Sequence, residues 1–75
     1  MSSPCYGVAL FYSTNWAIRA EKLALNAGFQ VKLVPTPRQL SANCGTALRF
    51  DWQERDRLTK LLVENGVSIE QVARL

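Results

Sequence analysis

Hydrophobic and polar positions change their spacing several times along this 75-residue chain. The run from Tyr6 to Tyr12 is apolar and rich in strand-forming residues, and it predicts a β-strand. From Trp16 to Ala27 the apolar residues recur at helical spacing, which predicts an amphipathic helix. Gly28 is the residue type that closes a helix in the left-handed conformation. The preceding residues, Ser13 to Asn15, are types that cap a helix N-terminus.

Two further strands follow this helix. Phe29 to Val34 alternates and contains β-branched residues, so it predicts a strand that ends before Pro35, which cannot donate to a ladder. Thr46 to Phe50 has the same character and predicts another strand. The order up to this point is strand, helix, strand, strand.

A second helix is indicated next, and the final segment is ambiguous. Asp51 with Glu54 three residues later resembles a capping box, and Gly66 is placed to end the helix. In residues 67–75 the apolar positions fit a strand, but they also fit a helix. The apolar face of the second helix consists of Leu58, Leu61 and Leu62.

If the final segment is a strand, the order becomes βαββαβ, which is the ferredoxin-like α+β pattern. We therefore expect one domain, residues 1–75, with a four-stranded antiparallel sheet and two helices on one face. In this topology the loop between the second and third strands lies where the first helix begins, so Cys44 should neighbour Ser13 and Thr14. Cys5 should lie about 20 Å away, too far for a disulfide with Cys44.

Composition narrows the class of protein. The chain is 48% hydrophobic and 20% charged with a formal net charge of +3, and no apolar run approaches the roughly 20 residues of a membrane span. The basic residues are scattered, so we expect neither a nucleic-acid nor a membrane partner. Two cysteines without a disulfide framework and no secretory signal favour a cytoplasmic protein. The aromatic residues expected in the core or on the sheet are Tyr6, Tyr12, Trp16, Phe50 and Trp52.

Cys44 is the residue with the clearest chemistry. A thiol with a pKa of about 8.5 becomes a useful nucleophile when a helix N-terminus or a guanidinium stabilises its thiolate. Arg38 lies on the same loop, where Thr36 to Gln39 resembles the first turn of a helix with Pro37 in its first position. Gly45 removes side-chain bulk and permits backbone angles that other residues avoid.

Other chemistries lack their residues. The chain has no histidine and no CxxC pair, its acids show no ligand spacing, and no glycine-rich phosphate loop is present. We therefore expect no metal and no cofactor. Thiol exchange needs only a thiolate and a good leaving group, so sulfur transfer fits a lone cysteine. The alternative is a buried, structural Cys44, because cysteine is often buried.

Several short motifs are spread over nearly the whole chain: Phe11 to Thr14, Ala20 to Lys22, Val34 to Arg38 with Pro35 and Pro37, and Ser41 to Gly45. Together these motifs resemble the Se/S carrier protein-like family. This resemblance implies a small ferredoxin-like domain and a proposed role in carrying sulfur or selenium on Cys44. Donor and acceptor proteins would load and unload it, so the resemblance implies a carrier more than a stand-alone enzyme. Trp16 departs from the smaller or polar residue expected in relatives.

Two other functions remain open. Residues 62–75 resemble a helix, a glycine turn and a second helix, as in a helix-turn-helix nucleic-acid binder, although the upstream half is strand-rich. A non-catalytic interaction module is the other alternative, because the sheet face away from the helices, or the open sheet edges, could pair with a second copy. We therefore expect a homodimer. The residues predicted on that exposed face are Val34, Ala47 and apolar residues of the first strand, in which Val8 and Leu10 alternate with Ala9 and Phe11 and both faces are apolar.

Overall fold

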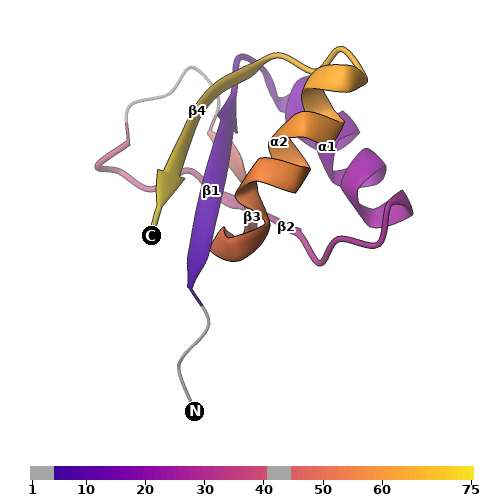
Figure 1. Ribbon diagram of the computed structural model, residues 1–75. Helices are drawn as coiled ribbons and strands as arrows, with labels where there is room; N and C mark the ends of the chain where they lie inside the picture. Colours follow the sequence, from indigo (N-terminus) through magenta and orange to yellow (C-terminus); the bar gives the residue numbers. More distant parts are fainter. Residues whose placement is uncertain (1–4, 41–44) are drawn as a thin grey trace.

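The computed structural model describes residues 5–40 and 45–75. Its elements are β1 (Tyr6–Phe11), α1 (Thr14–Asn26), β2 (Lys32–Pro35), β3 (Thr46–Asp51), the 3-10 helix η1 (Trp52–Glu54), α2 (Arg55–Glu64) and β4 (Ile69–Arg74). The four strands form one sheet in the order β2-β3-β1-β4, each antiparallel to its neighbour, and both helices lie on one side of it (Figure 1). The ferredoxin-like βαββαβ prediction is confirmed. Because the last segment is a strand, the helix-turn-helix interpretation is wrong.

Both helices end in the same left-handed glycine motif. Gly28 has φ 91° and Gly66 has φ 78°, as only glycine adopts without strain. Just beyond them, the Phe29 N–H donates to the Ala24 carbonyl at 2.9 Å, and an equivalent bond of 2.9 Å ends α2. The sequence predictions that Gly28 and Gly66 close the helices are confirmed.

The second strand differs from its prediction. It begins at Lys32, not at Phe29, and it includes Pro35, which is in register with Thr46. Phe29 instead packs against the core beneath the helices. Proline is tolerated in β2 because this is an edge strand, where the missing N–H removes no ladder bond on the solvent side.

A 3-10 turn precedes α2. Asp51 caps this turn, since its Oδ1 accepts the Gln53 N–H at 3.0 Å. The predicted cap is therefore present, but it caps η1, and α2 begins later at Arg55.

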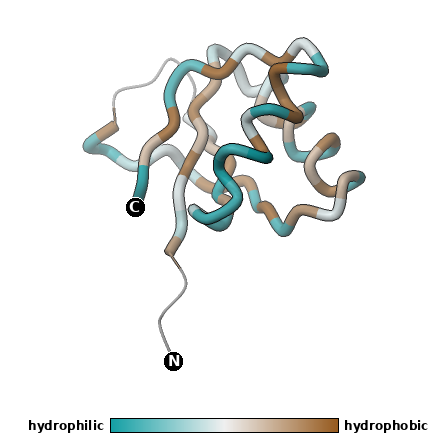
Figure 2. The backbone as a smooth tube through the Cα atoms, viewed as in Figure 1, coloured by the Kyte–Doolittle hydropathy of each residue, from teal (hydrophilic) through white to brown (hydrophobic). Residues whose placement is uncertain are grey.

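The main core lies between the helices and the sheet. Alanines 17, 20 and 24 form the buried stripe of α1, and such small side chains allow the helix to approach the sheet closely. Figure 2 shows the opposite character at the start of α2, which is hydrophilic. No helix of residues 5–40 and 45–75 is long and apolar enough to cross a membrane. The buried core residues from the strands and α2 are Ala9, Phe11, Leu48, Phe50, Leu58 and Leu62, joined by Val67.

A second, smaller cluster occupies the face away from the helices. Val8, Leu10 and Ala47 are at most 1% exposed, although no helix covers this face. Leu40, from the connection between β2 and β3, packs against them. The face is apolar as predicted, but the prediction that it is exposed is wrong, because its centre is buried. The connection that follows β2 contributes to this covering.

Candidate functional site

One end of the sheet gathers the predicted site residues. Leu10 of β1 is in register with Ala47, and Pro35 of β2 with Thr46, so β1 and β2 end where β3 begins. The Thr36 N–H donates to the Gly45 carbonyl at 2.9 Å, so the β2–β3 connection leaves and returns at one point. Because α1 starts soon after β1, its first turn lies at this end, which we call the loop end (residues 12–16, 36–40 and 45–46). The predicted placement of this loop is confirmed.

Cys44 itself lies outside the described residues, so its proximity to Ser13 and Thr14 stays a prediction. Gly45, which follows Cys44 in the sequence, is exposed, and a Cβ at Gly45 would have no neighbour within 4 Å among the described residues. The predicted open space is present among these residues, and the backbone freedom that Gly45 permits stays a prediction.

The start of α1 provides a positive environment at the loop end. Ser13 is the N-cap, with extended backbone, and its Oγ accepts the Trp16 N–H at 3.4 Å. The helix therefore starts at Thr14, earlier than the Trp16 predicted from the sequence. No acidic residue lies in the first turn, so no carboxylate offsets the partial positive charge of the helix N-terminus. A negative charge would be favoured here.

The loop begins with a tight turn. The Leu40 N–H donates to the Pro37 carbonyl at 3.0 Å, which places Arg38 and Gln39 in the middle of a four-residue turn. Arg38 is exposed, whereas Pro37 is half-buried. The predicted start of a helix at Thr36 is therefore a single turn. Its function in the fold is to hold Leu40 against the sheet while Arg38 faces solvent.

The aromatic residues have mainly structural positions. Trp16 is half-buried and packs against the main core, and Trp52 stacks on Phe50 with ring centroids 6.2 Å apart. The expectation of core or sheet positions is wrong for Tyr12, which is 53% exposed just beyond β1. Of the five aromatic residues predicted in the core or on the sheet, Tyr12 is the one that lies at the loop end outside the core.

The other cysteine lies at the opposite end of the sheet, which we call the Cys5 end. The Cys5 carbonyl accepts the Trp52 N–H at 2.9 Å, and Arg74 Nη2 donates to Cys5 Sγ at 3.3 Å. This cysteine–arginine contact was not predicted from the sequence. Its residues are 69 positions apart, and only the pairing of Gly7 with Arg74 brings them together. Cys5 therefore lies at the opposite end of the sheet from the described loop residues, as predicted, and its distance from Cys44 stays a prediction.

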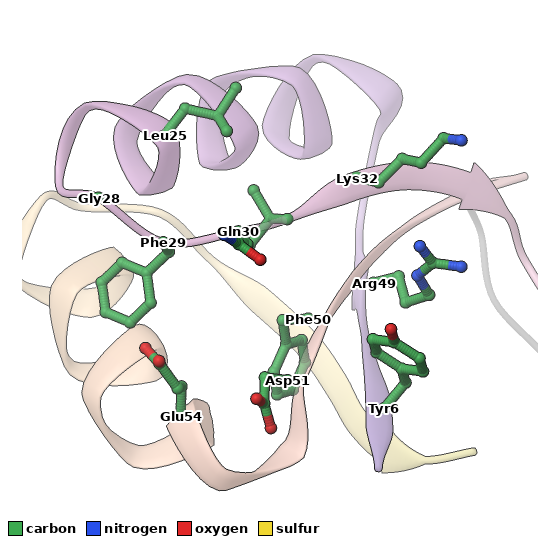
Figure 3. A pocket seen from close by; sticks show the side chains of 11 residues that line it. Tyr6, Leu25, Gly28, Phe29, Gln30, Lys32, Arg49, Phe50, Asp51 and Glu54 are labelled. Atoms are coloured by element: carbon green, nitrogen blue, oxygen red, sulfur yellow. The ribbon is translucent and has the colours of Figure 1, made fainter. Parts of the chain in front are cut away.

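A groove of about 680 Å³ also lies at the Cys5 end, where the chain before β2 diverges from β3 (Figure 3). Lys32 and Arg49 face each other across the two strands, and the Arg49 guanidinium lies 4.7 Å from the Tyr6 ring centroid. Asp51 and Glu54 contribute carboxylates to the same groove. The groove shares no lining residue with the described part of the loop end. Its other lining residues are Leu25, Gly28, Phe29, Gln30, Val31 and Phe50.

The comparison with known families agrees with this architecture. A family model described as "Putative Se/S carrier protein-like" matches residues 6–74. The chain belongs to this family. For this Se/S carrier-like protein, the match spans the whole sheet, both helices and the sequence of the β2–β3 loop. No curated protein and no solved structure matches the chain. Within the described ranges, no three histidine, cysteine or acidic residues are grouped as metal ligands.

Proposed function

We propose that this protein carries a sulfur or selenium atom on Cys44, as a persulfide or a selenosulfide, between a donor and an acceptor protein in the cytoplasm. The observation that carries the proposal is that the exposed Gly45 and the start of α1, whose first turn has no acidic residue, are at the same end of the sheet. Membership of the Se/S carrier-like family supports the same cargo. The reactive group is a thiolate, which requires no metal or cofactor.

The transfer is a thiolate displacement. The Cys44 thiolate attacks the outer sulfur of a donor persulfide, a new sulfur–sulfur bond forms, and the old bond breaks to release the donor as a thiolate. No electrons are gained or lost overall, so no separate oxidant is needed. Unloading repeats the same step, with the acceptor thiolate attacking the outer sulfur on Cys44. A selenium atom in the outer position would be transferred in the same way.

The surrounding residues have distinct proposed roles. The start of α1, with Ser13 as its cap and Thr14 as its first residue, stabilises the thiolate through the helix dipole. Arg38 adds an exposed cation on the same loop, and Gly45 leaves room for the donor and acceptor to approach. Pro35 and Pro37 restrict the start of the loop, because each ring fixes its backbone φ.

The test is loading by a low-molecular-weight persulfide, followed by mass spectrometry of the intact chain and of its peptides. We expect one added sulfur atom on Cys44 in the unaltered protein and in Cys5→Ser. Cys44→Ser should lose the modification completely. If Cys5 gains the sulfur instead, or if Cys44 gains none, the proposal fails and Cys44 is a structural residue of an interaction module.

A further inference from the structure

The outer edge of β4 is the longest unprotected strand edge that the structure describes. β4 is six residues long and ends the sheet order, whereas β2, at the other edge, has four residues and includes Pro35. Within residues 5–40 and 45–75, no strand lies beyond β4. An edge strand presents unpaired N–H and C=O groups that can pair with another strand.

The hydrogen-bond phase of β4 identifies which groups face outward. The Leu75 N–H donates to the Tyr6 carbonyl at 2.9 Å, so Leu75 faces β1. Backbone groups of successive residues point to alternate sides of an antiparallel strand, so Val72 and Arg74 direct theirs away from β1. The register shift lies further back, where Gln71 pairs with Leu10 and Ile69 with Phe11. The regular part of the edge is therefore centred near Val72.

The charges along this edge are complementary to a second copy of themselves. In an antiparallel pair centred on Val72, Glu70 of each chain lies opposite Arg74 of the other, and the two-fold symmetry repeats the pair. A pair centred on Glu70 or on Arg74 would instead oppose like charges. The outward N–H and C=O groups of Val72 would lie opposite those of Val72 in the second copy. The two residues could then exchange both N–H···O=C bonds, as a hydrogen-bonded antiparallel pair does.

Glu70 also lacks a donor within its own chain. Its Oε1 is buried and has no hydrogen-bond partner among the residues that the structure describes. A buried acceptor without a donor destabilises the fold. A guanidinium arriving along the edge would bring a positive charge beside this carboxylate. Arg74 is exposed and uses one nitrogen on Cys5 Sγ, and a guanidinium has five N–H donors in all.

We propose that two copies of the chain associate through antiparallel β4 edges, centred on Val72, to form one continuous eight-stranded sheet. This inference does not rest on the carrier function. Because the paired strands run in opposite directions, the two loop ends lie at opposite ends of the joined sheet. Both loops therefore remain accessible, and the dimer presents two separate loop sites.

The first test is sedimentation velocity over a range of protein concentrations, with circular dichroism to verify folding. We expect a reversible dimer of the unaltered chain. Glu70→Arg and Arg74→Glu should each weaken association at least about tenfold, which corresponds to about 1.4 kcal/mol. An equimolar mixture of these two variants restores both opposite-charge pairs, so it should form a heterodimer as tightly as the unaltered chain. Arg19→Glu, on the exposed face of α1, is the control and should dimerise normally.

A second measurement needs no variant. The Val72 N–H faces outward in a single chain, so its hydrogen exchange should become slower as protein concentration rises, in step with the dimer fraction. A chain that stays monomeric at all concentrations overturns the proposal. So does a mixture of variants that fails to associate, or Val72 exchange that is independent of concentration while a dimer is present.

Discussion

The two ends of the sheet differ in how tightly the chain is held. In the sequence, Cys5 directly precedes β1 at one end, and Cys44 lies just before β3 at the other. At the Cys5 end, backbone hydrogen bonds fix Cys5 to Trp52 and Tyr6 to Leu75, and Arg74 contacts the Cys5 sulfur. At the loop end, Gly45 is exposed, and no other described residue lies within 4 Å of a Cβ placed on it. The difference separates a cysteine that the fold holds in place from a loop end with open space beside Gly45. Two glycines, Gly7 and Gly45, express this contrast most directly.

Gly7→Ala should produce the largest effect. A Cβ at Gly7 would overlap the Trp52 ring, which cannot move freely because it stacks on Phe50 and has the Arg55 guanidinium 4.9 Å from its centroid. We expect the free energy of unfolding to fall by about 1–3 kcal/mol in urea titrations. Gly45→Ala is the matched variant and should change it by less than about 0.5 kcal/mol. Equal losses at both glycines would remove the contrast between the two ends.

Leu40→Ala should have the next largest effect. Leu40 is half-buried over Val8, Leu10 and Ala47, so its removal uncovers the open face of the sheet. We expect a loss of about 1–2 kcal/mol in the free energy of unfolding, less than for a fully buried leucine. Leu25→Ala, at a leucine that is 52% exposed on α1, is the control and should cost less than about 0.5 kcal/mol. If Leu40→Ala leaves the free energy of unfolding unchanged, the stability of the fold does not depend on this contact.

Arg38→Gln should have the smallest effect, on chemistry and not on stability. Arg38 is exposed, so the attraction between its cation and a thiolate is weakened by solvent. We expect the rate of persulfide loading on Cys44 to fall about two- to fivefold, and the difference should shrink at high salt. Arg19→Gln, another exposed arginine, should leave the rate unchanged. If both variants slow loading equally, net charge is responsible and Arg38 has no specific role.

Element types could be predicted from local sequence, but contacts between distant segments could not. Helix ends depend on neighbouring residues only, so their prediction succeeds. Gly28 and Gly66 end the two helices, and Ser13 caps the start of α1. The start of β2 was placed too early because Phe29 has a strand-forming side chain but packs into the core.

The site shows the same limit. The position of the loop follows from the order of the strands, and it is confirmed. Two contacts join residues that are far apart in the sequence, and no local pattern marks either of them. Leu40 packs on the sheet face away from the helices, and Arg74 contacts Cys5.

The central claim is that the loop cysteine, and not Cys5, is the reactive thiol. The most direct measurement is the alkylation rate of both cysteines in the same unaltered chain across pH, resolved by peptide mass spectrometry. The account predicts that Cys44 reacts faster than Cys5 and reaches half its maximal rate below about pH 8.5, the value for a free thiol. A Cys44 that titrates like a free peptide thiol, or that reacts more slowly than Cys5, would contradict it.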